Sequence, residues 1–256
     1  MGSAVEAAVR TIPEIAIAFD VPGLDQALVL DQRLGEGPEM AKVGLELFTA
    51  AGPDVVRALA DRGRRVFLDL KLHDIPNTVR GAAASAARLG ADLLTVHAMG
   101  GQRMVAAAVE GVAEAGGSTR VVGVTLLTSL DAFSLPPGFE RPFHAMIVIA
   151  QLAEMVEAAG AHGIVCSASD LAPVVGFLRR SVYAVTPGIR PAGGATHDQA
   201  RVTTVGEAVS MGSSLLVLGR AVTAAADPRA ALEAARAERD RAAAARLGSP
   251  GGSERR

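Results

Sequence analysis

The chain has 256 residues and a mass of 26.1 kDa, and half of its residues are apolar, which is enough for a large core in one or two domains. Its net charge of -2 and its 3% aromatic content lack the basic excess and the stacking rings that nucleic-acid binding needs. The single cysteine, Cys166, excludes an intramolecular disulfide and a cysteine-based zinc site, and no apolar run has the length of a transmembrane helix or a signal sequence. We therefore expect a cytoplasmic protein that binds neither nucleic acid nor membrane.

Short runs rich in valine, isoleucine and leucine alternate with longer alanine-rich segments along the chain. The runs recur roughly every 20 to 40 residues, a spacing typical of repeated strand–helix units. Between them, Pro53 marks the start of one helix and Gly63 its end, and the alanine-rich segment 100–117 is bounded by glycines. The expected strands are 15–20, 40–47, 66–72, 93–98, 121–127, 163–167, 183–189 and 214–220.

Eight strands that alternate with helices predict a (β/α)8 TIM barrel, here a single catalytic domain over residues 1–240. The alternative is a doubly wound open sheet, which is disfavoured because no G-x-G-x-x-G sequence follows the first strand and no Walker A sequence is present. The long, proline-rich segment 129–143 is expected to be an active-site loop. Residues 241–256, rich in alanine, arginine and glycine, are expected to form a flexible tail.

The segment "FLDLKLHDIPNTV" places three charged residues in or directly after an expected core strand. Side chains two residues apart on a strand face the same side, so Asp69 and Lys71 share a face with Phe67, and the leucines share the other. If the leucines face the helices, both charges point into the barrel near the carboxyl end of the strand, where TIM-barrel active sites lie. Asp74 then follows in the adjoining loop.

These three charges serve either stability or chemistry. A purely structural ion pair is the weaker alternative, because desolvation offsets the attraction and two carboxylates exceed what one lysine needs. A lysine between two carboxylates is expected to keep its proton, which makes it a poor Schiff-base nucleophile and a good acid for a developing carbanion. The carboxylates would also repel a bound anion, and a substrate that loses its own carboxylate relieves that repulsion. The pattern therefore points to decarboxylation or carbanion protonation.

The segment "DLKLHDIPNTV" resembles the D-x-K-x-x-D signature of the orotidine 5′-phosphate decarboxylase family. Further segments resemble sequence blocks of that family in the same order over roughly residues 14 to 234, and they are "AFDVP", "KVGLELF", "LTVHAMGG", "VTLLTS", "GIVCSASD", "TPGIR", "DQARVTT" and "LVLGRAVTAAADP". The resemblance implies a barrel of the ribulose-phosphate-binding type that converts orotidine 5′-phosphate to UMP and CO2 in the last step of de novo UMP synthesis. It implies no metal and no organic cofactor.

The resemblance also implies a role for each polar residue of the reacting centre. Asp20 contacts the ribose hydroxyls, and Lys42 joins the ribose and carboxylate network. Asp69 lies near the leaving CO2, and Lys71 protonates C6 of the pyrimidine. Further substrate contacts are implied for Thr128 near the base or ribose and for Gln199, Arg190, Gly219 and Arg220 at the phosphate.

Asp74 is implied to reach into the site of a neighbouring subunit, with Ile75 and Thr78 beside it, so complete sites require a homodimer. The chain departs from the family's pattern in two places. Phe19 stands where leucine is frequent, and His197 stands where many relatives have glycine or aspartate, which leaves its effect on the phosphate loop open. None of the five histidines is spaced as in a metal site.

Two other functions fit part of this pattern. A 3-keto-L-gulonate 6-phosphate decarboxylase shares the D-x-K-x-x-D strand but depends on magnesium, with an acidic ligand at the end of strand two, where this chain has Lys42. A non-catalytic sensor of nucleotide phosphates would keep the phosphate-binding residues, yet it would not need Asp69, Lys71 and Asp74.

Overall fold

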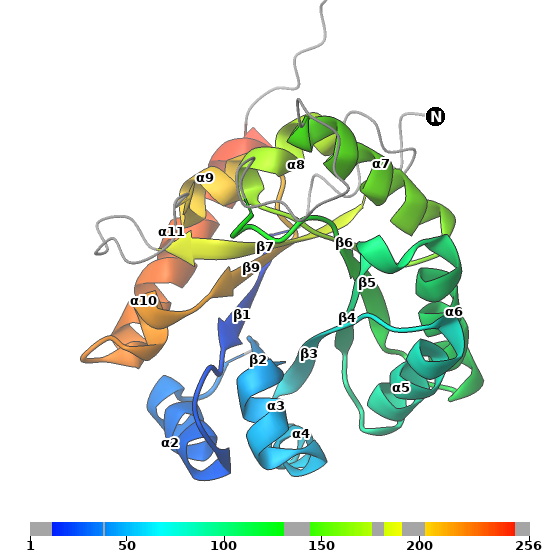
Figure 1. The fold of residues 1–256 in the computed structure, drawn as a ribbon. Coiled ribbons are helices and arrows are strands. Elements are labelled where there is room, and N and C mark those ends of the chain that lie inside the picture. The colour runs from blue at the N-terminus through cyan, green and yellow to red at the C-terminus, as the bar shows by residue number, and fades with distance from the viewer. Residues whose placement is uncertain (1–11, 38, 131–143, 176–181, 191–202, 249–256) are drawn as a thin grey trace, which may run out of the picture.

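The parallel strands of the chain form a closed barrel with helices around the outside (Figure 1). In the computed structural model, residues 12–37, 39–130, 144–175, 182–190 and 203–248 are described. Each of the first seven strands pairs with the next, and β9 closes the ring between β7 and β1, while the short β8 pairs only with β7. The predicted TIM barrel is therefore confirmed. The strands are β1 (Glu14–Ala18), β2 (Met40–Gly44), β3 (Arg65–Leu72), β4 (Leu93–His97), β5 (Arg120–Val124), β6 (Gly163–Val165), β7 (Tyr183–Arg190), β8 (Thr203–Thr204) and β9 (Leu215–Leu218).

Local sequence signals account for several helix boundaries. Pro53 is the first residue of α4, as predicted, and Gly63 adopts a positive φ just beyond its end. The strand expected over 40–47 is too long, because α3 begins at Leu45 and buries Leu47 as part of a helix. The helices are α2 (Leu24–Leu34), α3 (Leu45–Ala51), α4 (Pro53–Ala60), α5 (Pro76–Arg88), the 3-10 turn η1 (Ala98–Gly100), α6 (Gln102–Glu114), α7 (Ala145–Ala158), α8 (Ala168–Val175), α9 (Val205–Ser210), α10 (Arg220–Thr223) and α11 (Pro228–Gly248).

Alternate residues of the strands form two separate apolar clusters. One lies between the strands and the helices and includes Leu68, with Leu70 and Leu72 packed against it. The other fills the middle of the barrel and includes Phe67. The predicted division of β3 into a helix-facing and a barrel-facing side is therefore confirmed.

A polar layer lies beneath the inner cluster, at the amino ends of four alternate strands. Arg65 of β3 and the Tyr183 hydroxyl of β7 both donate to the Glu14 carboxylate of β1. The Arg120 guanidinium of β5 lies 4.6 Å from the centre of the Tyr183 ring. Burial raises the pKa of Glu14, but the hydrogen bonds from Tyr183 and Arg65 outweigh it and hold that pKa below its ordinary value. This layer closes one end of the barrel, opposite the carboxyl ends of the strands.

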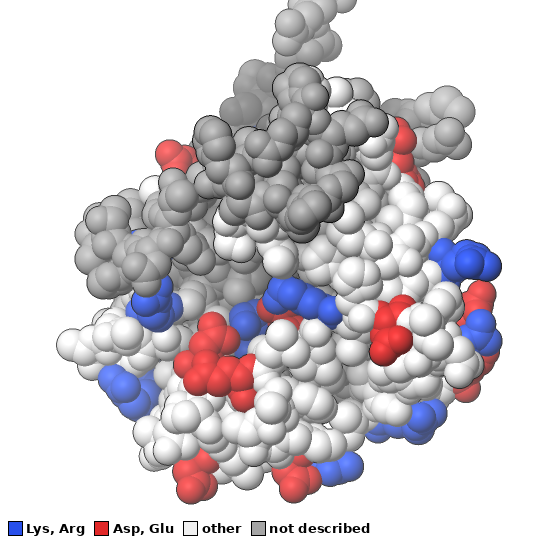
Figure 2. Space-filling view, viewed as in Figure 1, with Lys and Arg blue, Asp and Glu red and all other residues white. Residues whose placement is uncertain are grey.

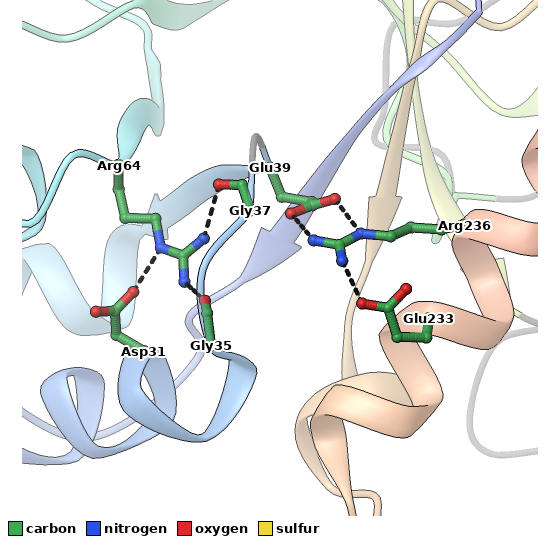
Figure 3. Close-up of polar contacts among 7 residues, drawn as sticks. All are labelled: Asp31, Gly35, Gly37, Glu39, Arg64, Glu233 and Arg236. Atoms are coloured by element: carbon green, nitrogen blue, oxygen red, sulfur yellow. Dashed lines mark hydrogen bonds and ion pairs between the residues drawn. The ribbon is translucent and has the colours of Figure 1, made fainter.

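The segment between α2 and β2 is held by two buried ion pairs (Figure 3). Glu39, only 4% exposed, accepts two hydrogen bonds from the Arg236 guanidinium of α11, the one from Nε to Oε1 at 2.6 Å. On the other side of the segment, Arg64 Nε donates to Asp31 Oδ1 at 2.6 Å, and Arg64 also donates to the Gly35 carbonyl. The last helix is thus tied to the start of β2, near the seam where the first and last barrel strands meet.

Helix α11 extends past residue 240, the expected end of the barrel domain. It continues through Gly248, and Ala243 within it is buried. Residues 241–248 therefore belong to a packed helix, and 249–256 lie outside the described residues. None of the helices in the described part of the chain has the length and apolar content needed to cross a membrane.

Replacing Arg236 with alanine is expected to lower the free energy of unfolding by about 3 kcal/mol, because it leaves the buried Glu39 carboxylate without its cation. Arg57→Ala is the matched control, since it breaks an exposed arginine–aspartate pair and should change stability by less than about 1 kcal/mol. Urea denaturation of both variants measures the difference. Equal stability of the two variants would contradict a stabilising role for the Glu39 pair.

Candidate active site

A cavity of about 660 Å³ lies at the carboxyl ends of the barrel strands. Its polar lining comes from β2, β3 and the end of β7, and from the segments that follow β1, β5 and β9. In Figure 2, basic and acidic side chains adjoin near the middle of the view. This is the end of the barrel at which TIM-barrel active sites are found.

Four charged side chains of alternating sign run across the first three strands into this cavity. Lys42 Nζ lies 3.1 Å from Asp20 Oδ1 and 3.7 Å from Asp69 Oδ2. Lys71 Nζ lies 2.8 Å from both carboxylate oxygens of Asp69. Lys42 and Lys71 are the only lysines in the sequence, so both lysine side chains of the protein contact the same carboxylate.

The strand register explains how these charges meet. Ala18 pairs with Lys42, and Gly44 pairs with Asp69, so the carboxyl ends of β1, β2 and β3 lie at one level. A Cβ atom on Gly44 would lie 3.2 Å from Lys42 Nζ and 3.4 Å from Asp20 Oδ1. Glycine at this position therefore leaves room for the ion pair between β1 and β2.

The backbone of β3 changes conformation at Lys71. Its φ of 48° is the only positive φ of a non-glycine residue among those described, and such conformations cost about 1 to 3 kcal/mol. The pairing of β3 with β4 shifts register between Leu68 and Leu72. The Lys71 amide donates to Thr95 Oγ1 of β4 at 2.8 Å, and the same hydroxyl donates to Asp69 Oδ1 at 3.0 Å. The Thr95 hydroxyl of the neighbouring strand thus supports the unusual backbone conformation of Lys71.

Two histidines lie beside the charged strand. The rings of His73 and His97 are stacked, with centroids 5.2 Å apart, and His97 Nδ1 accepts a hydrogen bond from the Met99 amide. Burial, followed by the nearby His73 and Lys71, lowers the pKa of His97 below its ordinary value. The stack joins the end of β4 to the segment that leads to Asp74.

Asp74 does not flank Lys71 as the sequence spacing predicted. Its side chain is exposed, its Oδ1 accepts a hydrogen bond from the Ile75 amide, and it does not line the cavity. Ile75 and Thr78 are exposed as well. The second charged partner of Asp69 within the chain is Lys42, so the prediction of a lysine between two carboxylates is wrong for a single subunit.

The predicted phosphate-binding residues that are described line the part of the cavity formed by the end of β7 and the turn after β9. Arg190 is buried at the end of β7, Gly219 precedes α10, and Arg220 is its first residue. Thr128, after β5, also lines the cavity. Gln199, His197 and residues 131–143 of the expected loop lie outside the described residues.

Thr95 is the residue of this site that the sequence did not reveal. It is fully buried and does not line the cavity, and its hydroxyl contacts the Asp69 carboxylate and the Lys71 amide. Its only signal was a polar residue in the apolar run "LLTVH", which is common in strands. In the part of the chain that is described, no three histidine, cysteine, aspartate or glutamate side chains are grouped so that they could hold a metal ion.

Comparison with known proteins gives a consistent result over most of the chain. The model of the "Orotidine 5'-phosphate decarboxylase / HUMPS family" matches residues 13–235. Orotidine 5'-phosphate decarboxylase from Cutibacterium acnes is 49% identical over 220 residues, which cover 86% of this chain and 93% of that protein. The enzyme of the same name from Nitratidesulfovibrio vulgaris strain DP4 is 52% identical over 231 residues, or 88% of this chain and 97% of that protein.

Solved structures agree with the sequence matches. The crystal structure of orotidine 5'-phosphate decarboxylase from Lactobacillus acidophilus superposes with a TM-score of 0.79 at 36% identity and covers 90% of this chain and 100% of that one.

Proposed function

Because the chain belongs to the Orotidine 5'-phosphate decarboxylase / HUMPS family, we propose that it converts orotidine 5′-phosphate to UMP and CO2. The two bacterial relatives, which are 49% and 52% identical to it, carry the decarboxylase name. One observation carries the proposal: the Lys71 ammonium lies 2.8 Å from both oxygens of Asp69 at the carboxyl end of a barrel strand. That arrangement suits a reaction in which a carboxylate leaves and a proton takes its place.

In the proposed reaction, the bond between C6 and the carboxylate breaks, and its electron pair stays on C6. The Lys71 ammonium stabilises this negative charge in a partly desolvated site and then donates a proton to C6. Asp69 holds the ammonium in place and lies close to the leaving carboxylate. The neutral amine regains its proton from solvent, so the protein is unchanged after each turnover.

The part of the cavity formed by the end of β7 and the turn after β9 is proposed to bind the phosphate. Arg190 and Arg220 offer guanidinium groups, and the backbone at Gly219 begins the turn after β9. Gln199 completes the proposed set, with Thr128 toward the base or ribose. Asp20 and Lys42 are proposed to contact the ribose. Binding energy from these remote groups would position C6 beside Lys71.

Lys42 separates this proposal from the magnesium-dependent 3-keto-L-gulonate 6-phosphate decarboxylase. In that alternative, an acidic side chain at the end of strand two binds the metal. Here the Lys42 ammonium lies between the carboxylates of Asp20 and Asp69, where it supplies a positive charge of its own. The contacts of Lys42 therefore favour the cofactor-independent reaction.

Lys71→Ala is expected to lower kcat for orotidine 5′-phosphate by about 10²- to 10⁴-fold, because it removes both the proton donor and the positive charge beside C6. The loss of substrate absorbance, followed with EDTA present, measures the rate. Arg57→Ala, an exposed substitution, should keep the wild-type rate. Near-normal turnover by Lys71→Ala would contradict the role of the lysine, and inactivity of the wild-type protein would contradict the function itself.

We further propose that the active unit is a homodimer in which Asp74 serves the partner's site. Support comes from large apolar side chains that are exposed in the segments after β3, β4 and β5, a feature of protein interfaces. Asp74 is exposed beside one of them and does not line the cavity of its own subunit. These apolar residues are Ile75, Met99, Leu127 and Ile147.

Mixing Lys71→Ala with Asp74→Asn subunits is expected to restore activity, because the mixed dimer contains one site with both wild-type residues. Random assortment of a symmetric dimer predicts recovery of about a quarter of the wild-type activity. Lys71→Ala mixed with Asp69→Asn is the matched control and should recover nothing, since both residues belong to the same site. Absence of recovery in the first mixture would contradict the shared site.

A further inference from the structure

The hydroxyl of Thr95 contacts the Lys71 backbone directly and the Lys71 ammonium through Asp69. It accepts a hydrogen bond from the Lys71 amide at 2.8 Å and donates to Asp69 Oδ1 at 3.0 Å. The same Asp69 oxygen lies 2.8 Å from Lys71 Nζ. The three contacts form a closed ring that starts at the backbone of Lys71 and returns to its ammonium group.

The chemistry of the three groups fixes the direction of each hydrogen bond in the ring. An amide N–H only donates, and an ionised carboxylate only accepts. A hydroxyl has one proton to donate and lone pairs to accept, so it can connect the two. An aliphatic side chain at position 95 would leave the Lys71 amide without this acceptor and would remove one donor from Asp69.

The ring lies at the place where β3 stops being regular. The pairing of β3 with β4 shifts between Leu68 and Leu72, and Lys71 between them has a φ of 48°. Such a conformation persists only where the surroundings hold it. Thr95 is fully buried in the middle of β4, so its hydroxyl has a fixed position from which to do so.

We propose that Thr95 is a positioning residue for decarboxylation, whose hydroxyl holds the Lys71 ammonium and the Asp69 carboxylate in their reacting geometry. It does not line the cavity and therefore acts through these two groups. The inference rests on the proposed function, because it assigns Thr95 a part in the step that Lys71 performs.

Thr95→Val keeps the shape of the side chain and removes the hydroxyl. It is expected to lower kcat by about 10- to 100-fold, because small displacements of a reacting group carry losses of that size. The KM should stay within about threefold of the wild-type value, since the groups proposed to bind ribose and phosphate are unchanged. Thr95→Ser, which restores the hydroxyl, should return kcat to within about threefold of wild type.

Thr119→Val is the matched control. Thr119 is also a buried threonine, and its hydroxyl donates to the Ala91 carbonyl at 2.6 Å, at the other end of the barrel. This variant removes a buried hydrogen bond without touching the ring, so its kcat should equal that of the wild type. A fall in kcat as large as that of Thr95→Val would assign the effect to general packing and would overturn the proposal.

The remaining outcomes are also decisive. Wild-type kcat in Thr95→Val overturns the proposal, whereas an inactive wild-type protein overturns the proposed function instead. If Thr95→Val does not fold, Thr95→Ala is compared with Thr95→Ser, and equal kcat values in that pair overturn the proposal. A crystal structure of the hydroxyl-free variant gives a readout independent of activity. The φ of Lys71 should leave the positive region in that structure. An unchanged φ and an unchanged position of Lys71 Nζ would overturn the proposal.

Discussion

The Asp69 carboxylate is the group on which the site depends. It contacts ammonium groups from β2 and β3 and a hydroxyl from β4, so one small anion fixes the relative positions of three neighbouring strands. A partly buried carboxylate is costly to leave without partners, and each of these contacts offsets part of that cost. The same contacts explain why β3 departs from regular pairing at Lys71. The amide of this lysine donates to the Thr95 hydroxyl and its ammonium donates to Asp69.

The rest of the barrel holds the strands around Asp69 in place. The polar layer around Glu14 closes the amino end, and the apolar cluster that includes Phe67 fills the middle. The cavity that holds the Lys42, Asp69 and Lys71 charges lies at the carboxyl end. The Glu39–Arg236 pair ties the last helix to the start of β2, the strand that carries Lys42. These contacts lie around the strands that carry the charges of the cavity.

The sequence predicted the barrel and the inward direction of Asp69 and Lys71, because the period of two in "FLDLKL" and the spacing of the apolar runs are local features. It did not predict Thr95, whose partners depend on a register shift between β3 and β4 that leaves no mark in either strand alone. It also placed Asp74 beside Lys71, because proximity in sequence cannot show where the chain turns after an unusual backbone conformation. The end of β2 was missed for a related reason: the apolar run after Gly44 fits a strand and a helix equally well.

The Lys71 ammonium is proposed to deliver the proton that replaces the carboxylate at C6. Turnover of orotidine 5′-phosphate by Lys71→Ala, with a small ammonium ion added to the assay, separates proton donation from positive charge alone. Methylammonium has protons to donate and should restore part of the lost kcat, whereas tetramethylammonium carries the same charge without a transferable proton and should not. Equal kcat values with the two ions would contradict proton transfer from an ammonium group.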